Sequence, residues 1–221
     1  MQESSSQSKL KLSSFKPEAG WFLEFYSDIY IYFPFIYSSA TGHGFDILKG
    51  SGTGLDHTSD SFTYYAEQVP DESMSAALTI NWWSTWSVHA RGGIMLRDTT
   101  DADSAYVFVG AAGARQGAVM QSRASAGERD VHHKMEFINN NDGPYWFNLN
   151  YVAGVDGNPG TVTGYYKKTE NGEWIELAQA PFTASSSHVL MGVANSAGDE
   201  HPHAVRQMNV EPIEISTNNL G

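Results

Sequence analysis

The clearest strand pattern in the chain is Tyr145-Trp146-Phe147-Asn148-Leu149-Asn150-Tyr151-Val152. Its odd-numbered residues are all apolar or aromatic, and they alternate with Trp146, Asn148 and Asn150. Successive side chains of a β-strand point to opposite faces of the sheet, so a period of two predicts a strand with one buried face.

Similar runs recur on both sides of this stretch at short intervals, with turn residues between them. The predicted strands cover residues 28–33, 45–48, 62–68, 75–82, 89–97, 105–110, 118–123, 132–138, 145–152, 161–168, 174–178, 188–194 and 204–215. Glu170-Asn171-Gly172-Glu173 predicts a hairpin turn, because Asn-Gly tolerates the positive φ that such turns need. About a dozen strands without a long amphipathic helix indicate an all-β sandwich or barrel.

Composition favours one globular domain. The chain has 221 residues, of which 41% are hydrophobic and 17% charged, and it contains no cysteine. This length suits one large β-sandwich and is short for two independent domains. We therefore expect a polar, serine-rich tail over residues 1–14 and a single β-sandwich domain over residues 15–221, with no disulfide.

The formal net charge of −12 argues against nucleic acid and anionic membranes as partners, because a polyanion would be repelled. The aromatic segment from Trp21 to Tyr37 is interrupted by Glu24, Asp28 and Pro34, so we expect strands there and no transmembrane segment. The first 14 residues lack the apolar core of a signal peptide.

Four segments resemble laminin-G-like domains of the concanavalin A-like lectin/glucanase superfamily. They are Gly50 to Tyr65, Ala90 to Val107, Tyr145 to Leu149 and Gly164 to Trp174. The resemblance runs in order from Phe45 to Ile215. It implies a two-sheet antiparallel jelly roll and an extracellular or cell-surface location, but it does not fix an activity.

A ligand-binding face is predicted from strand alternation. Arg97, Gln121, Arg123, Trp146 and Asn148 would share one concave sheet face if their strands lie in the same sheet. Aromatic rings stack on sugars, and planar amide and guanidinium groups hydrogen-bond sugar hydroxyls, so this set indicates glycan binding. The alternative is a solvated or covered face with Arg97 in a structural ion pair.

Trp82, Trp83 and Trp86 form a tryptophan cluster that predicts an adhesive interaction patch if the rings are exposed. The alternative is that Trp82 and one neighbour close the end of the sandwich.

No cofactor is predicted. Asp98, Asp101 and Asp103 could form a loose calcium site, although an Asx-type turn is favoured because the stretch lacks the glycine and distal glutamate of an EF-hand. His132-His133 and the pair His201 and His203 offer no nameable third metal ligand.

Catalytic patterns are missing from the sequence. The glucanase branch carries alternating carboxylates on one strand, whereas Glu211 and Glu214 are three residues apart and would face opposite sides. The sequence therefore favours a non-catalytic module that binds a glycan or a protein surface. The second hypothesis is an accessory subunit that docks through Trp21 to Tyr37, and the third is a glycan-degrading enzyme.

Overall fold

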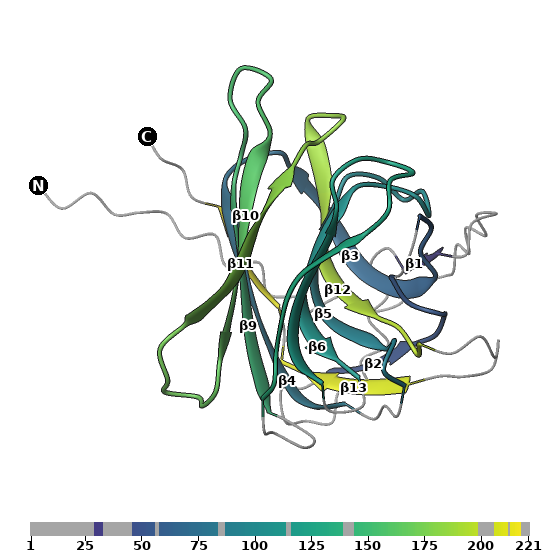
Figure 1. The fold of residues 1–221 in the computed structure, drawn as a ribbon, viewed down its shortest axis with the longest axis vertical. Coiled ribbons are helices and arrows are strands. Elements are labelled where there is room, and N and C mark those ends of the chain that lie inside the picture. Colours follow the sequence, from purple (N-terminus) through teal and green to yellow (C-terminus); the bar gives the residue numbers. More distant parts are fainter. Residues whose placement is uncertain are drawn as a thin grey trace, which may run out of the picture.

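A computed structural model describes residues 29–32, 46–55, 58–83, 87–113, 116–138, 144–198, 206–211 and 213–217. These residues form fourteen strands arranged in two sheets, which Figure 1 shows as two layers. No helix among them is long and apolar enough to cross a membrane.

Sheet A has seven strands. In spatial order they are β1 (Ile29–Tyr32), β3 (Phe62–Pro70), β12 (His188–Asn195), β5 (Arg91–Arg97), β6 (Tyr106–Ala112), β7 (Gly117–Arg123) and β8 (Val131–Glu136). Neighbouring strands are antiparallel except β1, which pairs with β3 in parallel. β8 is therefore the edge strand at the end opposite β1.

Sheet B is also seven-stranded and antiparallel. Its order is β11 (Ile175–Phe182), β10 (Gly160–Lys167), β9 (Tyr145–Val152), β4 (Met74–Trp83), β13 (Arg206–Val210) and β2 (Asp46–Gly50), and β14 (Glu214–Thr217) also pairs with β4. The predicted strand over residues 204–215 is thus divided, and its two halves pair with different parts of β4.

The main core lies between the sheets. Phe147, Leu149 and Tyr151 of β9 face inward and pack in one buried cluster with residues of β5, β6 and β12. A Cβ at Gly164 of β10 would come within 2.9 Å of Val109 and Met120 of sheet A, so the sheets touch closely there. The predicted alternation of Tyr145–Val152 is confirmed by its burial pattern.

A second buried cluster covers the outer face of sheet A. It contains Phe62, Tyr64, Tyr106 and Phe108, together with Leu55 from the segment before β3. This face is therefore not the open polar groove that strand alternation suggested. The all-β, two-sheet jelly-roll sandwich itself is confirmed.

Candidate functional site

The outer face of sheet A carries a buried ionic cluster made of Asp60, Arg97 and Arg123. Arg97 Nη1 donates to Asp60 Oδ2 at 2.7 Å, and Arg123 Nη2 donates to Asp60 Oδ1 at 2.7 Å. Both guanidinium groups lie near the ring of Tyr106, with their carbons 5.7 and 5.1 Å from its centroid. Because the charges are paired and hydrogen-bonded inside the protein, this cluster has a structural role.

The two arginines also hold the loops that cover them. Arg97 Nε donates to the carbonyl of Thr99, and its Nη2 donates to that of Asp101. Arg123 Nε donates to the carbonyl of Glu128 at 3.0 Å, and Nη1 donates to that of Ser104 at 3.1 Å. The loops after β5 and β7 are therefore fixed, and the second one leads directly to Asp130.

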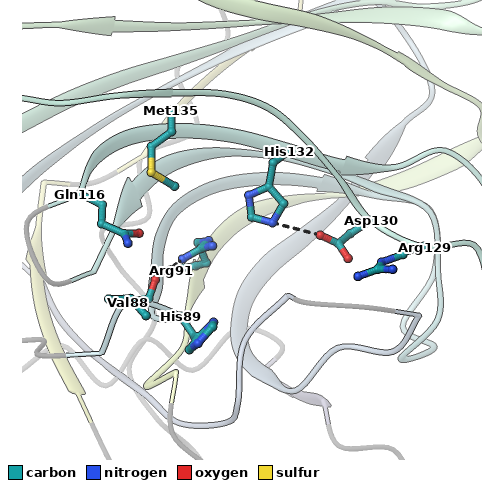
Figure 2. A pocket seen from close by; sticks show the side chains of 8 residues that line it. All are labelled: Val88, His89, Arg91, Gln116, Arg129, Asp130, His132 and Met135. Carbon is teal, nitrogen blue, oxygen red and sulfur yellow. Dashed lines mark hydrogen bonds and ion pairs between the residues drawn. The ribbon is translucent and has the colours of Figure 1, made fainter.

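A pocket of about 420 Å³ opens beside this cluster, between the start of β5 and strand β8 on the outer face of sheet A (Figure 2). Its lining combines cationic, amide, imidazole and apolar side chains with one carboxylate, namely Val88, His89, Arg91, Gln116, Arg129, Asp130, His132 and Met135. The volume lies in the range of small-ligand pockets, about 300–1,000 Å³.

A row of hydrogen bonds connects two lining residues, Arg91 and Asp130, through the buried Gln121. Arg91 Nε donates to Gln121 Oε1 at 3.2 Å, and Gln121 Nε2 donates to Asp130 Oδ2 at 3.0 Å. The same Asp130 oxygen lies 3.2 Å from His132 Nε2, the contact dashed in Figure 2. The row begins on a buried guanidinium and ends on an imidazole that is 42% exposed.

The backbone explains why His132 faces the pocket. His132 is paired with Gln121 across β7 and β8, so both side chains point to the outer face of sheet A. A register shift follows between Met120 and Gln121, and it leaves His133 on the other face, where its Nε2 lies 2.7 Å from Ser122 Oγ. Partial burial lowers the pKa of His133, and the neighbouring His132 lowers it further.

Two further residues of the pocket have fixed positions. Arg91 Nη1 donates to the carbonyls of Val88 and Ala90, so its guanidinium is held at the start of β5. Gln116 lies in the turn before β7, where Gly117 has a φ of 99° and a Cβ would come within 2.1 Å of the carbonyl oxygen of Glu136. Only glycine suits that backbone.

The five predicted ligand-binding residues do not share a face. Arg97, Gln121 and Arg123 do lie on one face of sheet A, as alternation predicted, but all three are fully buried. Trp146 and Asn148 belong to β9 in sheet B and point outward there. The prediction of a single groove is therefore wrong. The alternative, in which Arg97 belongs to a structural ion pair, is confirmed.

The tryptophan cluster is divided as well. Trp83 is buried in the main core, and its Nε1 donates to Asn195 Oδ1 at 3.2 Å. The prediction of an exposed patch that includes Trp83 is therefore wrong. Trp86 and the side chain of Trp82 lie outside the described residues. So do His201, His203 and most of the segment Trp21 to Tyr37, of which Ile29–Tyr32 forms β1.

The predicted calcium loop makes other contacts. Asp98 Oδ1 accepts hydrogen bonds from the backbone N and the Oγ of Ser185, and Asp101 Oδ2 accepts one from Thr99 Oγ1. Within the described part of the chain, no three His, Asp or Glu side chains gather where they could hold a metal ion.

The sequence did not predict this pocket, although one pattern in it was informative. Asp130-Val131-His132 places a carboxylate and an imidazole on the same side of an extended segment. That pattern alone could not identify Arg91, Gln116 and Gln121 as neighbours, because they come from other parts of the chain.

No known protein family and no curated protein matches the sequence. Among solved structures, the GH43B protein of the Bacteroides ovatus xyloglucan PUL matches with a TM-score of 0.54 and 13% identity, over 79% of this chain and 33% of that one. A Bacillus halodurans xylan β-1,4-xylosidase matches with 0.47 and 10%, over 77% and 32%. A Chlorella virus alginate lyase matches with 0.47 and 8%, over 78% and 85%.

At 13% identity the match to the GH43B protein shows the fold, a two-sheet jelly roll, and not the activity. The chain spans about a third of the length of the GH43B protein and of the xylosidase. The prediction of a non-catalytic glycan-binding module is nevertheless corrected. Its groove is not formed, because Arg97, Gln121 and Arg123 are buried while Trp146 and Asn148 lie on the other sheet.

Proposed function

We propose that the chain is a glycan-degrading enzyme whose reaction centre is the pocket between the start of β5 and strand β8, with His132 as its acid–base group. The observation that carries this proposal is the row from Arg91 through Gln121 and Asp130 to His132. Buried hydrogen bonds that end on an exposed imidazole fix the orientation of that ring.

The contact between Asp130 and His132 suits proton transfer. A carboxylate that accepts from one ring nitrogen selects the tautomer in which the other nitrogen carries the lone pair. With Nε2 directed at Asp130, Nδ1 is the nitrogen that receives the proton. Asp130 also stabilises the imidazolium that forms, and the amide of Gln121 keeps the carboxylate in place.

The remaining lining suits a sugar. Val88 and Met135 provide apolar walls, whereas Arg129, Gln116 and His89 provide hydrogen-bonding groups for hydroxyl or carboxylate oxygens. The GH43B protein that shares this fold belongs to a xyloglucan PUL, which supports a carbohydrate polymer as the substrate. We also propose that the chain is a laminin-G-like domain and that residues 15–221 form a single domain.

Among the described residues that line the pocket, Asp130 is the one carboxylate. Hydrolysis by a pair of carboxylates needs two on either side of the bond. The chemistry that this lining supplies is therefore proton transfer by an imidazole, in hydrolysis or in elimination from a uronic acid residue.

A substrate screen tests the proposal. The full chain and its His132→Gln variant are incubated with xyloglucan, xylan and alginate, and new reducing ends are measured together with the ultraviolet absorbance of unsaturated products. Cleavage of at least one polymer is expected, and His132→Gln should slow it by about 10²–10⁴-fold, the usual contribution of an acid–base group. Reducing ends without absorbance identify hydrolysis, and both together identify elimination. No cleavage of any polymer, or equal cleavage by the variant, contradicts the proposal.

A further inference from the structure

The outer face of sheet B is built differently from the pocket and lies on the opposite side of the sandwich. In β9 the side chains of Phe147 and Leu149 enter the core, while Trp146, Asn148 and Asn150 point outward and are half-buried. In β4, Ser75, Ala77 and Thr79 alternate with core residues in the same way. The outward side chains thus form a continuous surface over the central strands.

Strand register arranges these side chains in rows across β4, β9 and β10. Trp146 lies between Thr79 and Lys167, Asn148 lies between Ala77 and Tyr165, and Asn150 lies between Ser75 and Thr163. Opposite residues in a sheet have their Cβ atoms about 5 Å apart, and diagonal ones about 7–8 Å apart. The rings of Trp146 and Tyr165, which are diagonal neighbours, therefore lie beside a row of amides and hydroxyls.

This surface lacks charge in a strongly acidic protein. Among the described outward side chains of β4, β9 and β10, Lys167 is the one that carries a charge. Its Nζ donates to the carbonyl of Glu170 and lies 4.8 Å from the ring centroid of Trp174, so it is directed to the hairpin turn. Charges begin on the flanking strands, with Glu176 opposite Tyr165 and Glu214 opposite Ala77.

A hollow of about 280 Å³ continues the surface at its far end. It is lined by residues of β10, β11 and the preceding turn, namely Pro159, Gly160, Thr161, Gln179, Ala180 and Pro181. Thr161 is paired with Pro181, and Thr163 with Gln179, so the hollow adjoins the row that contains Asn150.

We propose that this face is a second glycan-binding surface, which holds an uncharged polysaccharide chain away from the catalytic pocket. Trp146 and Tyr165 provide rings that stack on the apolar faces of sugars, and Asn148 and Asn150 exchange hydrogen bonds with hydroxyls. A neutral polymer suits a face whose centre carries no charge, since neither repulsion nor the desolvation of an ion opposes binding. The inference rests on the proposed function only for the choice of a polysaccharide as ligand.

Affinity electrophoresis tests this surface without relying on cleavage. The His132→Gln chain is run in native gels that contain xyloglucan, xylan or alginate, alone and with Trp146→Ala or Asn148→Asp added. Asn148→Asp keeps the size of the side chain and adds charge at the centre of the face. Trp174→Ala is the matched control, because Trp174 is exposed on the hairpin outside the face. Thermal unfolding of each variant shows that it is folded.

Xyloglucan or xylan should retard the parent, and either face variant should weaken this retardation at least about tenfold in apparent Kd, which corresponds to about 1.4 kcal/mol. Trp174→Ala should behave like the parent. Retardation that survives both face variants, or retardation by alginate alone, overturns the inference. Cleavage by the chain with native His132 is assayed separately. Loss of binding in Trp146→Ala with intact cleavage of short oligosaccharides supports the surface and leaves the catalytic pocket in place.

Discussion

Arg97 Nη1 lies 2.7 Å from Asp60 Oδ2, and both side chains are completely shielded from solvent. Asp60 binds Arg123 through both of its oxygens, so one carboxylate joins β5 and β7 to the segment that precedes β3. The loops over the outer face of sheet A depend on this cluster, and so does the position of Asp130 at the end of one of them.

Asp60→Ala should destabilise the protein by about 3–5 kcal/mol, because it leaves two buried guanidinium groups without their carboxylate. Denaturant unfolding measures the loss. Asp103→Ala in the neighbouring loop is the control, since Asp103 is exposed, and its effect should stay within about 0.5 kcal/mol. Equal effects of the two substitutions would contradict a structural role for the cluster.

Gln121→Leu should cost about 1–3 kcal/mol of stability, because it removes the buried hydrogen bonds from Arg91 Nε to Gln121 and from Gln121 to the carbonyl of Leu55, which keeps Tyr106 Oη as a donor. It should also reduce glycan cleavage, since Asp130 loses a hydrogen bond that positions it. Gln68→Leu on the exposed part of β3 serves as the control for both measurements. A Gln121→Leu chain with native stability would show that the buried row is not formed.

His133 predicts a specific pH dependence of stability. Its pKa in the folded protein is lowered from 6.5, so below pH 6.5 the unfolded chain binds more protons than the folded one. The contribution of neutral His133 is therefore present above pH 6.5 and is lost as the pH falls through the lowered value. His133→Gln should flatten the curve of unfolding free energy against pH in this window. An unchanged slope would contradict the burial of this ring.

Trp83→Ala should destabilise the protein by about 3–5 kcal/mol, because it empties a core position and removes the hydrogen bond to Asn195. Trp174→Ala removes a similar ring from the surface and should cost far less. Thermal unfolding of both variants distinguishes a core role of Trp83 from an interaction patch, for which the two losses would be alike.

The alternation of apolar and polar residues predicted most of the strands correctly. The odd residues of β9 are buried as expected, and Asn171 and Gly172 lie in the turn between β10 and β11, which pair as a hairpin. Alternation also placed Arg97, Gln121 and Arg123 on one face correctly. These are local properties, because a side chain's face depends only on its position along its own strand.

The residues of the candidate site could not be predicted from strand alternation. Trp146 and Asn148 lie on the other sheet because strand order is set by pairing between distant segments. Arg97 and Arg123 are covered by loops whose fold depends on the arginines themselves. Similarly, the pocket joins Arg91 and His132, which are separated by forty-one positions in the chain, and only the register of β5, β6, β7 and β8 brings them together.

The most direct test of the catalytic assignment compares His132→Gln with His133→Gln on whichever polymer the full chain cleaves. The two histidines are adjacent in β8 but face opposite sides, and only His132 lines the pocket. We predict that His132→Gln lowers kcat/KM by about 10²–10⁴-fold while His133→Gln stays within a few-fold of the unsubstituted chain. Equal losses in the two variants, or a larger loss in His133→Gln, would contradict the assignment of His132 as the acid–base group.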